Sequence, residues 1–217
     1  MTTDLKLYTF KLCPFAHRVR LTLAEKGLSA QTIEIDLKNK PGDFTSISPY
    51  GRVPVLLHGA TRLWESSVIM EYLDETFPDP SLMPGASSER AQARLWIDFA
   101  NSCLFASTHR LIFERDEAQR RSLVEQMHRD VAVLDQALQS RETKPYLLGS
   151  RFTLADIALY PWFEQLRTLE KFSAFRMPGD CRGIREWSAA VAARPAVRQC
   201  AHADDWYENN YRRYLAA

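Results

Sequence analysis

The sequence of 217 residues has little net charge, no long apolar run and no closely spaced cysteines. Its 28 basic and 27 acidic residues leave a formal charge of +1, so bulk electrostatics provides no attraction to nucleic acid or to a membrane surface. No apolar run approaches the length of about 20 residues that spans a bilayer. The first six residues have neither a basic region nor an apolar stretch, so we expect no signal peptide. We therefore expect no nucleic-acid partner and no membrane partner.

The four cysteines stand far apart, at Cys13, Cys103, Cys181 and Cys200. No pair has the spacing of a redox Cys-x-x-Cys motif or of a metal site, so the pattern argues against a disulfide framework and gives no reason to expect a metal. Such cysteine usage is typical of a reducing compartment, and we expect a cytoplasmic protein. We interpret the last three cysteines as structural or incidental.

The most informative stretch runs from Lys11 to Arg18, between a strand-like pattern and a helical one. Pro14 is favoured as the first residue of a helix, because it lacks an N–H group that would have no partner there. That places Cys13 at the N-cap. The amide groups of Phe15 and Ala16, together with the helix dipole, would then lower the pKa of the thiol and stabilise a nucleophilic thiolate. The alternative is a buried cysteine that behaves as a small hydrophobe.

The first 78 residues predict a βαβ unit followed by a ββα unit. Because a strand, a helix and a second strand follow one another, the first two strands should be parallel. Pro54 would remove a ladder hydrogen bond from the third strand, so we expect it at an edge or in a cis-prolyl bend. Ser66 or Ser67 is a good N-cap for the last helix. The predicted strands are residues 5–10, 32–37, 53–57 and 62–64, and the predicted helices are 14–26 and 66–78.

A segment rich in proline, serine and glycine, residues 79–88, predicts a linker between a domain of residues 1–78 and a domain of residues 89–217. The second domain shows only helical periodicity, and we expect it to be all α. Thr153 and Asp156 have the spacing of a capping box, and Phe152 could staple onto Ile157. We assign this motif to folding. The predicted helices lie near residues 88–112, 117–140, 153–170 and 181–202.

This organisation resembles the soluble glutathione transferase superfamily over essentially the whole chain. The resemblance implies an α/β N-terminal thioredoxin-like domain and an all-α C-terminal domain that forms the pocket for the second substrate. The sequence is most similar to the omega-like, cysteine-dependent branch. Four blocks carry this similarity: Cys-Pro-Phe-Ala-x-Arg at 13–18, residues 36–41, residues 49–56, and Glu65-Ser66 followed by residues 71–75.

The resemblance implies glutathione as co-substrate and assigns a role to each block. Cys13 would meet the glutathione sulfur, and the backbone of Val53, before the bend at Pro54, would pair with the cysteinyl peptide. Glu65 and Ser66 would hold the γ-glutamyl end, where a carboxylate can meet the free amine and a helix start suits a carboxylate.

Two further residues complete the implied glutathione site. Lys40 would contact the glycyl carboxylate, although position alone suggests a solvated surface lysine. Phe15, next to the cysteine and its proline, belongs to the same set.

Residue 16 is alanine, so the loop cannot form its own disulfide, and we expect a monothiol cycle through a Cys13–glutathione mixed disulfide. The implied activities are thiol transfer, dehydroascorbate reduction and deglutathionylation, with a small electrophile or disulfide as partner, in a homodimer. An enzyme like the glutathionyl-hydroquinone reductases is an alternative, because the loop also resembles theirs. A non-catalytic, partner-binding module of the same fold is another, as in stringent-starvation-type proteins.

His17 lies four residues after Cys13 and could assist its chemistry or be an ordinary exposed helical histidine. Aromatic residues of the second domain could line the substrate pocket or pack in the core. These are Trp162, Phe163, Trp206, Tyr207, Tyr211 and Tyr214.

Overall fold

The computed structural model describes residues 4–216, which form two compact units. The first unit comprises the chain up to Met83 together with Pro195–Cys200, and the second comprises Pro84–Arg194 and the residues from Ala201 onward. The chain therefore passes from the first unit to the second at Met83, inside the proline-rich segment. Within residues 4–216, no helix is long and apolar enough to cross a membrane.

The first unit contains a mixed four-stranded sheet with strand order β2-β1-β3-β4. β1 pairs with β2 in parallel, as the βαβ pattern predicts, and β3 pairs with β1 and β4 in antiparallel fashion. The strands are β1 (Leu5–Thr9), β2 (Gln31–Glu34), β3 (Val55–His58) and β4 (Thr61–Trp64). The helices are α1 (Pro14–Glu25), α2 (Phe44–Ile47), α3 (Ser66–Thr76) and α10 (Pro195–Cys200).

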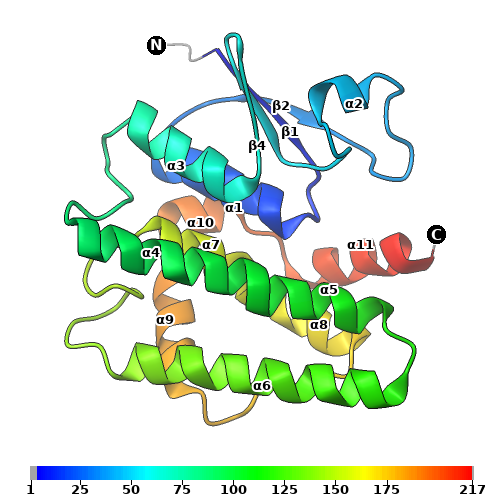
Figure 1. The fold of residues 1–217 in the computed structure, drawn as a ribbon, viewed down its shortest axis with the longest axis vertical. Helices are drawn as coiled ribbons and strands as arrows, with labels where there is room; N and C mark the ends of the chain where they lie inside the picture. Colours follow the sequence, from blue (N-terminus) through cyan, green and yellow to red (C-terminus); the bar gives the residue numbers. More distant parts are fainter. Residues whose placement is uncertain (1–3, 217) are drawn as a thin grey trace. The chain divides into compact units, whose positions relative to one another are not determined.

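Successive side chains of β1 point to opposite faces of the sheet. Leu5 and Leu7 point to one face, where they join a core with Val19 of α1 and Ile69 of α3. Tyr8 points to the other face, toward α2. Figure 1 shows α1 and α3 side by side in this unit. The start of α1 is thereby fixed at the end of β1.

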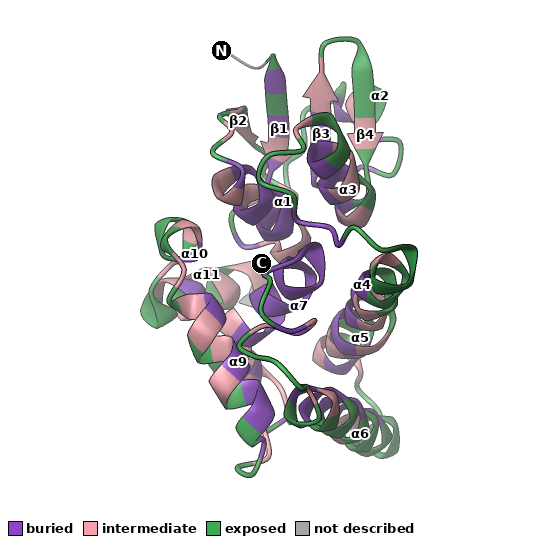
Figure 2. Cartoon of the chain, turned by 90° about the vertical axis from the view of Figure 1, so that its left-hand side faces the viewer, coloured by how far each residue is buried: buried purple, intermediate pink, exposed green. Residues whose placement is uncertain are grey.

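The second unit consists of helices, with one isolated bridge between Tyr146 and Gly149. Its centre is α7, of which every residue from Leu154 to Phe163 is buried (Figure 2). The capping box of Thr153 and Asp156 at its start is confirmed. The helices are α4 (Ser87–Phe99), the π-helix η1 (Ala100–Phe105), α5 (Ala106–Phe113), α6 (Glu117–Gln139), α7 (Leu154–Glu164), α8 (Leu166–Phe172), α9 (Arg182–Ala192) and α11 (Asp204–Ala216).

Several predicted element boundaries are wrong, each for a local reason. The second strand was predicted over residues 32–37, but β2 ends at Glu34. The last hydrogen bond to β1 is the one that the Ile35 N–H donates to Thr9 O, and Thr9 is the last residue of β1. The segment predicted as one helix over residues 181–202 breaks before Pro195, which starts α10. The last helix, α11, was not predicted, although Tyr207, Tyr211 and Tyr214 recur along it at helical spacing.

Candidate functional site

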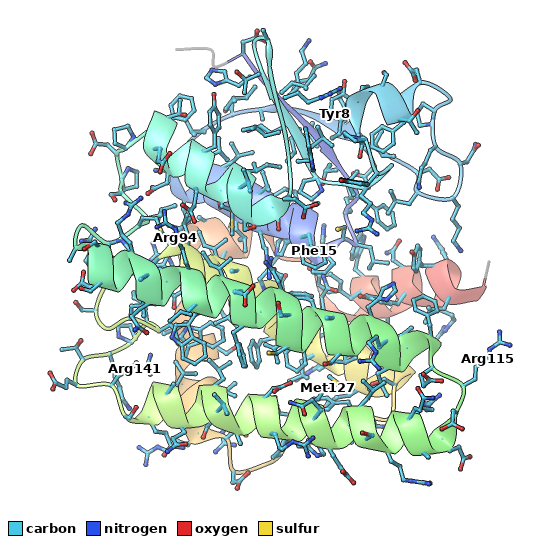
Figure 3. All side chains as sticks on the ribbon, viewed as in Figure 1. Tyr8, Phe15, Arg94, Arg115, Met127 and Arg141 are labelled. Atoms are coloured by element: carbon cyan, nitrogen blue, oxygen red, sulfur yellow. The ribbon has the colours of Figure 1, made fainter. Side chains whose placement is uncertain are left out.

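Cys13 is the N-cap of α1, and Pro14 is its first helical residue, as the sequence predicts. A short turn links β1 to this helix, because the Cys13 N–H donates to Phe10 O at 2.9 Å. The Cys13 backbone is extended, with φ −71° and ψ 118°, as N-cap residues typically are. Phe15 follows at the start of α1 (Figure 3). The fold therefore places the sulfur where the free amide groups of the first turn converge.

The prediction that the N-cap position gives the Cys13 thiol a lowered pKa is wrong. Burial raises the pKa of the Cys13 thiol, and the amides of Ala16 and Phe15 and the guanidiniums of Arg20 and Arg18 only partly oppose it. The thiol forms no capping hydrogen bond and donates instead to Val53 O, 3.7 Å from Sγ. The expected donors are in place, but the sequence does not show how strongly burial by the surrounding segments opposes them.

A cavity of about 150 Å³ is lined by five of the predicted site residues: Phe15, Val53, Pro54, Glu65 and Ser66. Cys13 adjoins the cavity through its contact with Val53. The first unit thus brings together three blocks that are far apart in the chain. The other lining residues are Ser48, Tyr50, Arg52 and Trp64.

Lys40 does not line this cavity. Its Nζ lies beside Gly51, where an added Cβ would be 3.5 Å away. Because Tyr50 and Arg52 flank Gly51 and both line the cavity, the ammonium group is still close to one wall. Gly51 has φ +60°, a conformation that glycine adopts without strain.

Hydrogen bonds fix the loop that carries Val53. The Ser48 hydroxyl donates to Arg52 O at 2.7 Å and accepts from Arg52 N at 2.8 Å. The following Val53–Pro54 peptide bond is cis, and Pro54 lies before β3 rather than within it. Tyr50 and Arg52 lie in the block of residues 49–56, and membership of that block is the sequence signal for their place in the cavity wall.

Glu65, rather than Ser66 or Ser67, is the N-cap of α3, which corrects the prediction. Glu65 has φ +68° and is the one non-glycine residue with positive φ among residues 4–216. Such a conformation costs about 1–3 kcal/mol and clusters at functional sites. Ser66 follows as the first residue of the helix and is 5% exposed. Both residues lie at the positive end of a helix of 11 residues, which favours an anion.

Arg18 belongs to the Cys-Pro-Phe block, and its place beside the candidate site was not predicted from the sequence. Its side chain is fully buried, and Nη1 donates to Ser66 Oγ at 3.3 Å. The guanidinium also lies over the Phe15 ring, 4.9 Å from the centroid. Burial lowers the Arg18 pKa to about 9, and the neighbouring Cys13 acts in the opposite direction. Arg18 therefore links the start of α1 to the start of α3.

His17 is fully buried, so the interpretation as an exposed helical histidine is wrong. Its Nδ1 lies 3.2 Å from Arg20 Nη2.

All four cysteines are thiols. Cys200 Sγ donates to Arg20 O at 3.8 Å, on the α10 side of α1.

Four of the six aromatic residues singled out from the sequence divide into two groups. Trp162, Phe163 and Tyr207 are buried, and the Trp162 indole donates to Thr108 Oγ1 at 2.8 Å. Trp206 instead stacks on His202 and helps to line an open hollow of about 620 Å³. For the first three, the core-packing interpretation is confirmed.

Comparison with known proteins finds matches along most of the chain. Residues 12–76 match the family model of the glutathione S-transferase N-terminal domain, and residues 115–190 match that of the C-terminal domain. Glutathione S-transferase omega-1 of Sus scrofa is 33% identical over 194 residues, which are 89% of this chain and 78% of that protein.

Solved structures agree with these matches. Glutathione transferase Omega 3C from Trametes versicolor has a TM-score of 0.84 at 26% identity, covering 100% of this chain and 92% of that one. Rice GST1 in complex with glutathione also has a TM-score of 0.84, at 28% identity, covering 96% of this chain and 95% of that one.

Proposed function

We propose, because this chain belongs to the glutathione S-transferase family, that it is an omega-like, cysteine-type transferase whose Cys13 forms a mixed disulfide with glutathione. The single observation that carries this proposal is the sulfur of Cys13 at the first turn of α1, in contact with the wall of the 150 Å³ cavity. Its activity is that of a thiol transferase and reductase, including dehydroascorbate reduction and deglutathionylation.

The lining of the cavity supports a specific pose for glutathione. The cysteinyl peptide pairs with the Val53 backbone, which leaves the tripeptide sulfur near Cys13. Glu65 meets the free amine of the γ-glutamyl end, and the Ser66 hydroxyl and the start of α3 meet its carboxylate. Lys40 contacts the glycyl carboxylate, and Phe15 and Pro54 form the apolar walls. Arg52 also lines the cavity and adds a second cation for that carboxylate.

Binding in this pose would also change the state of the Cys13 thiol. The thiol donates to Val53 O, and burial raises its pKa. A peptide N–H of glutathione would compete for the same carbonyl oxygen. The thiol would lose its acceptor, and the amides of Ala16 and Phe15 would remain to stabilise the thiolate.

The chemical cycle consists of two thiol–disulfide exchanges. The Cys13 thiolate attacks the glutathionyl sulfur of a mixed disulfide, an S–S bond forms to Cys13, and the other thiol leaves as a thiolate that takes up a proton. The thiolate of a second glutathione attacks the Cys13 adduct, giving oxidised glutathione and the free Cys13 thiolate. In dehydroascorbate reduction, two glutathione molecules supply the two electrons and two protons and become one disulfide.

Intact-mass analysis tests this function. After exposure to oxidised glutathione, the wild-type protein should gain the mass of one glutathionyl group, and Cys13→Ser should gain none. Cys103→Ser is a matched control that should keep the adduct. An adduct that persists in Cys13→Ser, or that peptide mapping places on Cys103, Cys181 or Cys200, would show that the assignment is wrong.

The remaining parts of the proposal concern assembly and location. We expect a homodimer, as the family resemblance implies, and a cytoplasmic protein, in keeping with four cysteines that are all in the thiol form. The helical domain, residues 89–217, would supply the pocket for the second substrate. Light scattering after size-exclusion chromatography should give about twice the chain mass of 25.0 kDa.

A further inference from the structure

Arg20 of α1 makes hydrogen bonds to three consecutive residues that lead from β1 toward Cys13. Its Nη1 donates to Thr9 Oγ1 at 2.7 Å and to Phe10 O at 3.4 Å, and its Nη2 donates to Lys11 O at 2.9 Å. The planar guanidinium can bridge several acceptors because its N–H groups form a rigid fork. One side chain thus connects the middle of α1 with the end of β1 and the loop that follows.

The same loop holds the nucleophile in place. Phe10 O, which accepts from Arg20, also accepts the Cys13 N–H at 2.9 Å. Lys11 is held from both sides, because its N–H donates to Glu34 Oε1 at 2.7 Å and its carbonyl accepts from Arg20. Neither anchor lines the 150 Å³ cavity, so both act on Cys13 through the backbone.

We propose that Arg20 is a positioning residue that fixes residues 9–11, at the end of β1 and in the loop that follows, and thereby holds the Cys13 sulfur at the start of α1 and opposite Val53. The inference rests on the proposed function, since it concerns the nucleophile of that site. Arg20 also contributes its charge, which acts to lower the pKa of the Cys13 thiol. Arg20 therefore has two separable effects, the bridging of the loop and the positive charge.

Two substitutions separate these effects. Arg20→Met keeps most of the length of the side chain and removes both the charge and the donors. Arg20→Lys keeps a charge, but its ammonium group lacks the planar fork and cannot reproduce the same set of bonds. Arg141→Met is a matched control, because Arg141 also bridges backbone carbonyls, those of Leu138, Pro145 and Tyr146, within the second unit (Figure 3).

The experiment measures the alkylation of Cys13 by iodoacetamide as a function of pH, followed by tryptic peptide mapping. Cleavage after Lys11 and Arg18 releases residues 12–18, which contain Cys13 as their one cysteine. We expect Arg20→Met to react about two- to fivefold more slowly at pH 7, the effect of one part-exposed charge, with its pH profile shifted upward. Arg20→Lys should keep a pH profile near that of the wild type. In thiol-transfer assays both variants should lose kcat and keep the KM for glutathione, and Arg141→Met should match the wild type in every readout.

Failure of this inference differs from failure of the proposed function. If the wild-type protein forms the Cys13 adduct and both Arg20 variants match it in pH profile and kcat, the positioning role is wrong and the function stands. If the wild-type protein forms no adduct, the proposed function fails first. If circular dichroism shows that Arg20→Met does not fold, Arg20→Lys alone tests the inference. A kcat equal to that of the wild type in Arg20→Lys would show that the planar guanidinium of Arg20 does not position Cys13.

Discussion

Substituting Glu65 by glycine should make the ligand-free protein more stable and weaken its binding of glutathione. The backbone at Glu65 has φ +68°, where a side chain costs about 1–3 kcal/mol. Glycine removes that cost but adds about 0.5–1 kcal/mol of unfolded-state entropy. The difference leaves a net stabilisation of about 1 kcal/mol, which corresponds to a rise in Tm of about 2–4 °C for a chain of this size.

The same substitution removes the carboxylate that we place opposite the amine of glutathione. A hydrogen bond to a charged group contributes about 1.5–3 kcal/mol, so the affinity for glutathione should fall roughly 10- to 100-fold. Thermal unfolding with and without millimolar glutathione measures both effects, because a ligand that binds only the folded state raises Tm. Glu65→Gly should therefore start at a higher Tm and gain less from glutathione than the wild-type protein.

Glu65→Ala is the matched control, because it also lacks the carboxylate but keeps a Cβ at the positive φ. We expect it to lose affinity like Glu65→Gly without the gain in stability. If Glu65→Gly is no more stable than Glu65→Ala, the backbone at this N-cap is not strained. If both variants keep the glutathione-induced rise in Tm of the wild-type protein, Glu65 does not bind the tripeptide.

Three further predictions concern stability and the Cys13 thiol. Lys26→Met should lower the free energy of unfolding in urea by about 3–5 kcal/mol, because it leaves the buried Asp74, 2.8 Å from Lys26 Nζ, without its cation. A decrease of less than about 1 kcal/mol would contradict the importance of this ion pair. Asp156→Asn should lower the free energy of unfolding by about 2–4 kcal/mol, because the amide NH₂ of asparagine would face two of the donors that the carboxylate now accepts from, which belong to Leu147, Trp187 and Thr153. Denaturant unfolding followed by tryptophan fluorescence would test this. Because burial raises the pKa of the Cys13 thiol, its alkylation rate in the ligand-free protein should still increase above about pH 8.5, and a plateau below pH 7 would refute that shift.

Local chemistry was enough to predict the start of α1 and the start of α7. Cys13 with Pro14, and Thr153 with Asp156, are short-range patterns whose geometry depends on a few neighbouring residues. The alternating pattern of β1 was sufficient in the same way, because Leu5, Leu7 and Thr9 are buried on one face while Lys6 and Tyr8 on the other are not.

The features that the sequence did not reveal depend on distant segments or on backbone conformation. The pKa of Cys13 is raised because other parts of the fold bury it, and no spacing in the sequence encodes that burial. Arg18 reads as an ordinary helical arginine until its burial and its contact with Ser66, 48 residues away, are known. The positive φ of Glu65 is equally invisible, since neither a glycine nor an asparagine marks the position.

The place of α10 limits how this protein can be divided. Residues 195–200 come late in the chain, yet they belong to the first unit, where Val197 is buried and Cys200 contacts the backbone of α1 at Arg20. A fragment that stopped at Met83 would leave that side of α1 without its cover, and a chain shortened before Pro195 would have the same defect. Fusion proteins or split reporters built on this scaffold should therefore retain residues 195–200, because the unit that carries the 150 Å³ cavity is not one contiguous segment of the chain.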